Sequence, residues 1–309
     1  MISVALCTYN GADFIQQQLD SIFTQTVPVD EVVICDDCSM DSTFTILKTY
    51  AAKYPQIRLI KNEINLGFRA NFEKALIECQ GDYIFFSDQD DIWSKDKVDN
   101  TVSFLKESGM YGVYTDGILI NEDNQRLGES LFARIKLRPY IEHHLLEQNE
   151  FEILCLNGNH VTGATLAITK SAKDLVLPFR TSKILLHDMW MALRLSSINK
   201  LGCLDKPLIS YRLHTSQECG LSQDRISDLF YNCYLGQGDY RDLLDMRGRT
   251  IAPVYVCKLN FLARWRIFRT YKNLCVKCIR RHFQLSGIMK LLFVECVVAY
   301  QSIVGIEEQ

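Results

Sequence analysis

The sequence lacks both of the glycine-rich loops that commonly bind nucleotides. No Gly-x-Gly-x-x-Gly follows the first apolar run at residues 2–6, and no Gly-x-x-x-x-Gly-Lys-Ser/Thr occurs anywhere in the 309 residues. Those loops cradle phosphates with backbone N–H groups, so their absence argues against a dinucleotide-binding Rossmann enzyme and against a P-loop NTPase. If the chain binds a nucleotide, we expect side chains at strand ends to hold it and a metal ion to offset the charge of its phosphates.

The sequence also lacks a clear membrane-spanning run and a recognisable secretory leader. The best candidate for a span, 287–306, is interrupted by Lys290 and Glu295. Residues 1–6 have no basic start and are typical of a strand. We therefore expect a cytoplasmic protein whose twelve cysteines are reduced thiols. The spacing Cys-x-x-Cys occurs twice, but one pair brackets a strand end and the other lies in a helical pattern, so we do not expect a shared zinc site.

Acidic residues are missing from one long segment. Residues 246–294 hold eleven Lys and Arg and no Asp or Glu, whereas the rest of the chain has 23 basic and 37 acidic residues. At 255–281 aromatic and aliphatic side chains are interleaved with these charges, which is typical of a helix in a membrane interface. The alternative is a packed helix with a solvated basic face. We expect residues 225–309 to form a helical, basic extension that associates with the cytoplasmic membrane surface. Nucleic acid is not an expected partner, because the sequence contains no recognisable nucleic-acid-binding motif.

What the sequence does contain is a regular alternation of apolar strands and amphipathic helices. This alternation predicts a mostly parallel sheet with helices on both faces. The expected strands are 2–6, 31–35, 57–60, 83–86, 112–115 (ending at Asp116), a run through Ile168, and 208–214; the expected helices are 14–23, 43–54, 71–79, 97–106 and one that begins at His187. Residues 121–152 are polar and irregular, and we expect a mobile loop or short helices there. Ser39 or Asp41 is expected to cap the helix at 43–54.

An acidic cluster follows the strand at 83–86. Asp88, Asp90 and Asp91 lie within four residues, and like charges packed so closely raise one another's pKa unless a cation lies among them. Oxygen ligands of this kind suit a hard divalent ion such as Mg²⁺ or Mn²⁺. In open α/β sheets, ligands collect at the carboxyl ends of strands, which is where the cluster lies. The alternative is a solvated acidic turn.

Four motifs, in order along the chain, carry a resemblance to a known family. They are Thr8-Tyr9-Asn10, Asp36-Asp37-Cys38-Ser39-Met40-Asp41, Asn65-Leu66-Gly67 and Ser87-Asp88-Gln89-Asp90-Asp91. Together they resemble the family 2 glycosyltransferases of the GT-A fold, in particular the bacterial rhamnosyl-, galactosyl- and glucosyltransferases of surface polysaccharides. The resemblance covers roughly residues 1–220. Cys38 stands where the family usually has glycine, and we expect it to be tolerated with a negative φ.

The resemblance implies a domain organisation and a role for each motif residue. It implies an α/β catalytic domain over 1–224, with a nucleotide-binding half (1–116) and an acceptor-binding half (117–224), followed by the extension at 225–309. The residues expected to bind the nucleotide are Thr8, Tyr9, Asn10, Asp36, Asp37, Gly67, Asn71 and Asp88. Those expected near the donor sugar or acceptor are Asp91, Trp93, Gly163, His187, Trp190 and Arg212. Asp90 and His214 are expected to bind a divalent cation, Mn²⁺ or Mg²⁺, and Asp188 is expected to be the catalytic base.

Some of these assignments compete with structural interpretations of the same residues. Asp188 would also serve as an N-terminal acid of its helix, and a lone His214 is often a hydrogen-bonded structural histidine. Asp91 is an alternative for orienting the acceptor. The His143-His144 pair is not expected to bind a metal, because nothing nearby completes a site.

The function implied by the resemblance is transfer of a single sugar with inversion of configuration. The donor is expected to be a UDP- or dTDP-sugar, and the acceptor a saccharide carried on a polyprenyl diphosphate at the inner face of a bacterial membrane. The Gln-x-x-Arg-Trp signature of processive synthases is absent. One alternative is a sugar-nucleotide pyrophosphorylase, which would need a glycine-rich, basic loop in place of residues 8–13. Another is a non-catalytic sugar-nucleotide-binding scaffold, which would tolerate the loss of Asp90 or Asp188.

Overall fold

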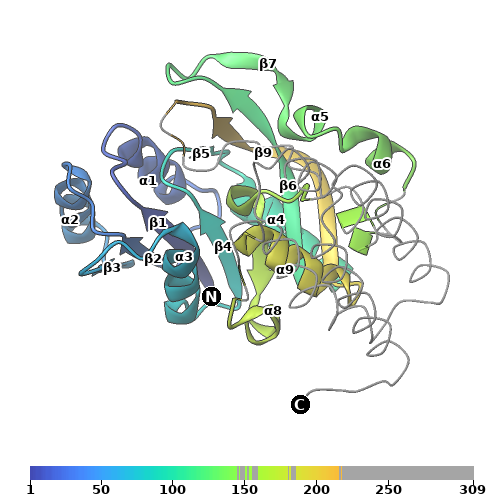
Figure 1. Ribbon diagram of the computed structural model, residues 1–309, viewed down its shortest axis with the longest axis horizontal. Coiled ribbons are helices and arrows are strands. Elements are labelled where there is room, and N and C mark those ends of the chain that lie inside the picture. Colours follow the sequence, from blue (N-terminus) through green and yellow to red (C-terminus); the bar gives the residue numbers. More distant parts are fainter. Residues whose placement is uncertain are drawn as a thin grey trace, which may run out of the picture.

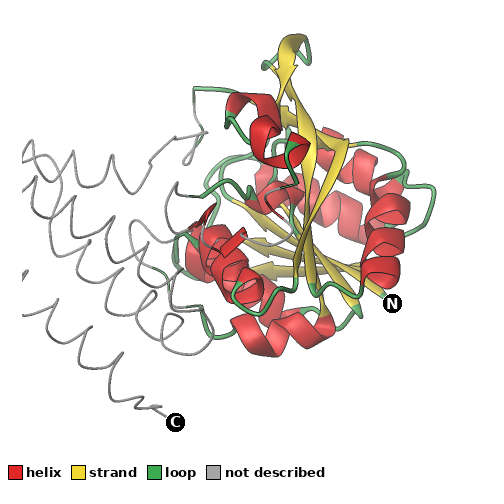
Figure 2. Cartoon of the chain, turned by 90° about the vertical axis from the view of Figure 1, so that its right-hand side faces the viewer, coloured by secondary structure: helices red, strands yellow, loops and turns green. Residues whose placement is uncertain are grey.

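The computed structural model describes residues 1–144, 159–179 and 186–215, together with residues 146, 150, 151, 153, 154, 181 and 217. Within them, eight strands form a continuous mixed sheet in the order β3-β2-β1-β4-β8-β6-β9-β5, and β7 pairs with β6. Helices cover both faces of this sheet, as Figures 1 and 2 show. The predicted extension at 225–309, with its basic segment, lies outside the described residues.

The first half of the sheet is parallel and follows the predicted alternation. Its strands are β1 (Ile2–Thr8), β2 (Glu31–Asp36), β3 (Ile57–Lys61) and β4 (Tyr83–Ser87), joined by α1 (Ile15–Phe23), α2 (Thr43–Lys53) and α3 (Phe68–Glu78). β1 lies between β2 and β4, and all three run in the same direction. Their carboxyl ends therefore meet at one edge of the sheet, which brings the predicted motifs together.

The second half of the sheet mixes strand directions. β8 (Ala167–Thr169) is antiparallel to both β4 and β6 (Gly112–Ile120), whereas β6 runs parallel to β9 (Leu201–Arg212). The short β5 (Ile92–Trp93) adds an antiparallel edge to β9. Around these strands are α4 (Lys97–Ser108), α5 (Leu131–Arg134), α6 (Arg138–Glu142), η1 (Gly163–Thr165), α8 (Lys170–Val176) and α9 (His187–Ser196). The mixed α/β sheet with flanking helices is thus confirmed.

Strand β6 is longer than predicted. We expected it to end at Asp116, but it runs on to Ile120 alongside β9, with its register shifted around Asp116. The Asp116 carboxylate is fully buried, accepts hydrogen bonds from the N–H groups of Gly117 and Phe132, and forms an ion pair with Arg138. Because these partners satisfy the charge, it does not end the strand. The predicted boundary between residues 116 and 117 falls inside β6.

The expectation of a loop or short helices at 121–152 was wrong for one part of that segment. Residues Arg126–Ser130 form β7, which pairs with β6 as a hairpin. The turn is built by Asn121, whose side-chain oxygen accepts hydrogen bonds from the N–H groups of Asp123 and Gln125, and by Asn124, whose φ is 64°. Asparagine suits such turns because it tolerates the left-handed conformation.

Two apolar clusters lie on opposite faces of the sheet. Ile84 and Phe86 belong to one cluster, with Phe72 of α3, whereas Phe85, between them in sequence, belongs to the other, with Leu19 of α1. This alternation follows from the two-residue period of a strand. Burial of each such side chain contributes about 1.5–3 kcal/mol. The strands that end in the motifs are therefore held from both sides.

Cys38 departs from expectation. Its φ is 66°, not negative, so this cysteine adopts the left-handed conformation that glycine takes at little cost. For a residue with a Cβ atom the conformation costs about 1–2 kcal/mol. The N-cap of α2 is Ser42, which makes no side-chain capping bond, so neither Ser39 nor Asp41 takes the cap position as predicted. Asp41, one residue earlier, does accept a hydrogen bond on Oδ1 from Thr43 N at 2.9 Å.

No helix among the described residues is long and apolar enough to cross a membrane.

Candidate nucleotide and metal site

The loop after β1 is tied to the loop after β2. Asn10 N donates to Ser39 Oγ at 2.9 Å, and Asn10 Oδ1 accepts from Met40 N at 2.8 Å. Gly11 N donates to Thr43 Oγ1 at 2.8 Å. These bonds cross between two motifs that lie about thirty residues apart in the sequence, so the two loops form one unit at the edge of the sheet.

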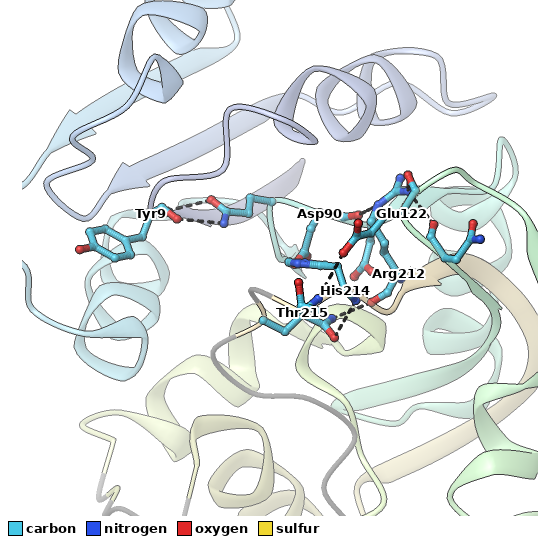
Figure 3. A network of polar contacts seen from close by, with 10 residues as sticks. Tyr9, Asp90, Glu122, Arg212, His214 and Thr215 are labelled. Atoms are coloured by element: carbon cyan, nitrogen blue, oxygen red, sulfur yellow. Dashed lines mark hydrogen bonds and ion pairs between the residues drawn. The ribbon is translucent and has the colours of Figure 1, made fainter.

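On its other side, the same loop is held by Gln89, a residue that the sequence analysis did not single out. Its side-chain amide accepts from Tyr9 N at 2.8 Å and donates to Tyr9 O at 3.0 Å (Figure 3). A Cβ atom on Gly11 would lie 2.1 Å from Gln89 Oε1, so only glycine leaves room for this contact. Gln89 thus joins the loop after β1 to the acidic loop after β4. Its position inside the acidic motif did not by itself indicate this contact.

Asp36 and Asp37 are buried and fully engaged with the protein. Asp36 accepts from Thr8 Oγ1 at 3.1 Å and from Ser39 N at 3.1 Å. Asp37 accepts from the N–H groups of Leu66 and Gly67, each at 2.8 Å. Gly67 has φ 78°, which glycine adopts readily, and it precedes the first turn of α3. These carboxylates therefore hold the loops that surround the predicted nucleotide site.

Asn71 belongs to the same buried network. It donates to Cys35 O at 2.8 Å and accepts from Asn62 Nδ2 at 2.9 Å, and Asn62 Nδ2 also donates to Asp37 Oδ1 at 2.8 Å. Among the residues expected to bind the nucleotide, Tyr9 has an exposed side chain, with 38% of its surface accessible. Direct contacts of all these residues with a nucleotide, that of Tyr9 included, stay predictions.

Asp90 and His214 are brought together, as predicted for a shared ion. His214 Nε2 lies 2.8 Å from Asp90 Oδ2, and the imidazole packs against Phe14 with ring centroids 4.9 Å apart. Figure 3 shows the two side chains facing each other between the end of β9 and the loop after β4. The two residues are 124 positions apart in the chain, and their meeting depends on β9 lying in the same sheet.

The neighbouring carboxyl groups repel one another. Burial, followed by the charges of Asp90 and Asp188, raises the pKa of Asp88 to about 8. Burial, together with Asp90 and Asp88, also raises the pKa of Asp91 well above its ordinary value. Asp91 Oδ1 accepts from Arg212 N at 3.0 Å, but its Oδ2 is buried without a hydrogen-bond partner among the described residues. Such a cluster attracts positive charge.

The residues fit a divalent cation that shares its coordination with a ligand. The described residues contain no group of three or more His, Cys, Asp or Glu side chains arranged to hold a metal ion. They do offer the Asp90 carboxylate and the His214 imidazole, and the next residue, Asp91, has a buried carboxylate oxygen without a hydrogen-bond partner among the described residues. Mg²⁺ commonly binds through one or two carboxylates and completes its shell with substrate phosphates and water.

Arg212 organises the end of β9 and is buried there. Its guanidinium donates to Asp90 O at 2.7 Å, to the carbonyls of Asn121 and Glu122 at 3.1 Å, and to Gln17 Oε1 at 3.1 Å (Figure 3). It therefore links the acidic loop, the β6–β7 turn and α1. A contact of Arg212 with donor or acceptor stays a prediction.

Asp188 lies in the first turn of α9 and is held by Asn159 and by Gly163, the first residue of η1. The Asn159 side chain and the Gly163 N–H donate hydrogen bonds to its carboxylate, and Met189 N donates to its Oδ1 at 2.6 Å. Burial nevertheless raises the pKa of Asp188 to about 6. The charge of Asp188 also contributes to the raised pKa of Asp88, so the two carboxyl groups are near enough to interact electrostatically. A carboxyl with this pKa is suited to general-base work near neutral pH.

His187, next to Asp188, is a buried and neutral histidine. Its ring stacks on Phe72 at 4.4 Å with an interplanar angle of 17°, and Phe179 also packs against it. Burial and the charge of Arg69 lower its pKa to about 3. Neither ring nitrogen has a hydrogen-bond partner among the described residues. A Cβ atom at Gly163 would come within 3.0 Å of His187 Nε2, which explains the glycine.

The two tryptophans expected near the sugar both lie in the core. Trp93 is 3% exposed, and Trp190 is 5% exposed with its indole N–H donating to Val176 O at 2.7 Å. Their apolar rings support the sheet and α9, and their roles toward a sugar stay predictions.

Comparisons with known proteins agree with this architecture. Residues 3–142 match the family model described as glycosyl transferase family 2. The chain is 34% identical over 133 residues to the putative teichuronic acid biosynthesis glycosyltransferase TuaG of Bacillus subtilis, covering 43% of this chain and 53% of that protein. The chain thus spans about half the length of the curated relatives it matches.

Two solved structures share the fold at low sequence identity. Staphylococcus aureus TarS 1–349 in complex with UDP-GlcNAc has a TM-score of 0.54 at 18% identity, covering 88% of this chain and 80% of that one. The mannosyltransferase PcManGT of Pyrobaculum calidifontis, in complex with GDP-Man and Mn²⁺, has a TM-score of 0.55 at 15% identity, with coverages of 99% and 88%. These neighbours are GT-A glycosyltransferases, so the predicted fold is confirmed.

Proposed function

Because this chain is a bacterial family 2 glycosyltransferase of the GT-A fold, we propose that it transfers one sugar, with inversion, from a UDP- or dTDP-sugar to a hydroxyl of a lipid-linked saccharide. The observation that carries the proposal is the buried Asp188 carboxyl, whose pKa is raised to about 6 and whose charge acts on Asp88 in the acidic loop at the ends of the parallel strands. In open α/β sheets, ligands bind at the carboxyl ends of the strands, so a nucleotide diphosphate would bind beside that loop.

The chemistry assigned to Asp188 is that of a general base. It takes the proton of the acceptor hydroxyl while the hydroxyl oxygen forms a bond to the anomeric carbon of the donor sugar. The bond from that carbon to the diphosphate oxygen breaks, and the electron pair leaves with the diphosphate. A single displacement of this kind inverts the configuration, by the same stereochemical reasoning as for inverting glycosidases.

Asp90 and His214 are the residues that would hold a divalent cation, Mn²⁺ or Mg²⁺. Such an ion, when bound, supplies positive charge beside the departing diphosphate. The protein's own contribution is to keep both side chains in place: Arg212 holds the Asp90 carbonyl at 2.7 Å, and Phe14 packs against the His214 ring. The complex of the mannosyltransferase neighbour with GDP-Man and Mn²⁺ supports a divalent ion at this site.

The acceptor and the location in the cell rest on the basic segment 246–294. Its eleven basic residues and interleaved apolar side chains would hold the catalytic domain at an anionic membrane surface on the cytoplasmic side. The relation to a teichuronic acid enzyme supports a saccharide acceptor in cell-surface polysaccharide synthesis. A polyprenyl-diphosphate carrier would present such an acceptor at the membrane.

A donor screen tests the function directly. Thermal unfolding is followed with UDP-, dTDP- and GDP-sugars, each with Mn²⁺ and with EDTA, and the stabilising donor is then used in transfer to membrane extracts. We expect one donor to raise the unfolding temperature with Mn²⁺ and to give a product of inverted anomeric configuration by NMR. Retained configuration, or equal transfer by an Asp188→Asn variant, would overturn the mechanism.

Membrane association is tested separately by liposome flotation of the full chain. Binding is expected with phosphatidylglycerol at low salt and is expected to weaken at high salt, because exposed charges are screened within about 10 Å at 0.1 M. Protein that stays unbound under all conditions would refute the membrane role and leave a soluble acceptor.

A further inference from the structure

A buried polar cluster lies apart from the acidic loop and has no role in the chemistry above. The hydroxyl of Tyr114 on β6 donates to Glu150 Oε1 at 2.8 Å, and His160 Nε2 lies 2.6 Å from the same oxygen. All three side chains are buried, with exposures of 0%, 7% and 8%. Buried polar groups are costly unless they are paired, and a fully paired network fixes the segments that it joins.

The cluster is continuous with the segment that holds Asp188. His160 is followed by Val161, whose N–H donates to Asn159 Oδ1 at 3.1 Å and whose carbonyl accepts from Asn159 Nδ2 at 2.9 Å. The Asn159 side chain and the Gly163 N–H both donate to the Asp188 carboxylate. Residues 159–163 are thus anchored to the core through His160 and reach Asp188 at two points.

We propose that Tyr114, Glu150 and His160 are positioning residues for Asp188: they fix residues 159–163 so that Asn159 and Gly163 hold the carboxylate in place. The proposal rests on the proposed function only in taking Asp188 as the base. None of the three residues reaches the reacting atoms, and each acts through the segment 159–163.

Two nearly isosteric changes, Tyr114→Phe and Glu150→Gln, test the proposal by kinetics. Each is expected to lower kcat by about 10- to 100-fold with the donor KM unchanged, because a displacement of about 1 Å in a catalytic group costs on the order of 100-fold. The control is Tyr50→Phe on α2, which removes a Tyr–carboxylate hydrogen bond of the same length, 2.8 Å to Asp20 of α1, at an exposed position. Thermal unfolding confirms that each variant is folded.

A double mutant separates positioning from a general structural effect. If the cluster acts through Asp188, Glu150→Gln added to Asp188→Asn should cause no further loss of kcat, because residues that act as one unit are not additive. Unchanged kcat in both single variants, or the full additional loss in the Asp188→Asn background, would overturn the proposal.

A measurement without turnover keeps this inference separable from the proposed function. The Asp188 carboxyl is titrated by ¹³C NMR, assigned with Asp188→Asn, in the wild type and in Tyr114→Phe. The titratable groups near it include the adjacent His187, Asp88 after β4 and Tyr211 on β9, and none of them is altered. Loss of donors from Asn159 and Gly163 should raise the pKa of Asp188. An unchanged titration refutes the positioning role, even if no donor is ever turned over; a shifted titration in an inactive enzyme refutes only the proposed function.

Discussion

Replacing Arg212 with methionine should destabilise the fold. The guanidinium donates hydrogen bonds to two loops and to α1, and it is fully buried. Methionine fills similar volume but removes the donors that Arg212 supplies to the carbonyls of Asp90, Asn121 and Glu122; of these, the Asn121 carbonyl keeps the N–H of Asn124 as a donor. Removing one partner from a buried charged network typically costs about 3–5 kcal/mol.

The loss should be visible in thermal unfolding. For a domain of roughly 150–250 residues, each kcal/mol shifts Tm by about 2–4 °C, so Arg212→Met should lower Tm by roughly 6–20 °C. Arg212→Lys should recover only part of this loss, because an ammonium group cannot reach the separate acceptors as a planar fork does. Arg126→Met, on the exposed β7, is the control and should change stability by no more than about 0.5 kcal/mol.

The alternative role predicts the opposite pattern. If Arg212 chiefly contacts the donor or acceptor, Arg212→Met should keep its Tm and lose affinity for the sugar nucleotide in titration calorimetry. An unchanged Tm would therefore refute the structural assignment and restore the role implied by the family resemblance.

Four further outcomes follow from the site. Asp188→Asn should keep UDP affinity and lower kcat by about two to four orders of magnitude, and wild-type activity should fall about tenfold per pH unit below pH 6, since the base must be ionised. Asp90→Ala should abolish metal-dependent transfer while leaving the fold intact; full activity in EDTA would contradict the ion's role. Because the pKa of Asp88 is raised in the fold, the folded state binds more protons between about pH 4 and 8, so stability without metal should fall as pH rises through that window; Mn²⁺ should reduce the loss in Tm. Cys38→Gly should raise stability by about 1 kcal/mol by relieving the left-handed cysteine, and a lower urea midpoint would contradict that account.

The parts of the fold that could be predicted from the sequence are those with local signals. Residues 2–6 and 83–86 are apolar runs closed by polar motifs, and they form β1 and β4. The helix that begins at His187 was likewise visible from the polar pair ahead of an apolar run. In each case the information lies within about ten residues, where hydrophobic period and capping act.

The features that escaped prediction depend on distant partners. Asp116 is a charged residue that would end a strand, but Arg138 and the Phe132 N–H satisfy it inside β6. Gln89 is an ordinary polar residue until the fold brings Tyr9 beside it, 80 positions away. No local pattern could indicate either pairing, because the partner decides the role of the side chain.

The position of β8 has a mechanical consequence. Ala167 lies opposite Phe85 of β4 on one side and opposite Val113 of β6 on the other, so hydrogen-bonded backbone runs unbroken between the two halves. A hinge motion between the two halves would therefore have to break the hydrogen bonds that β8 makes with β4 or with β6.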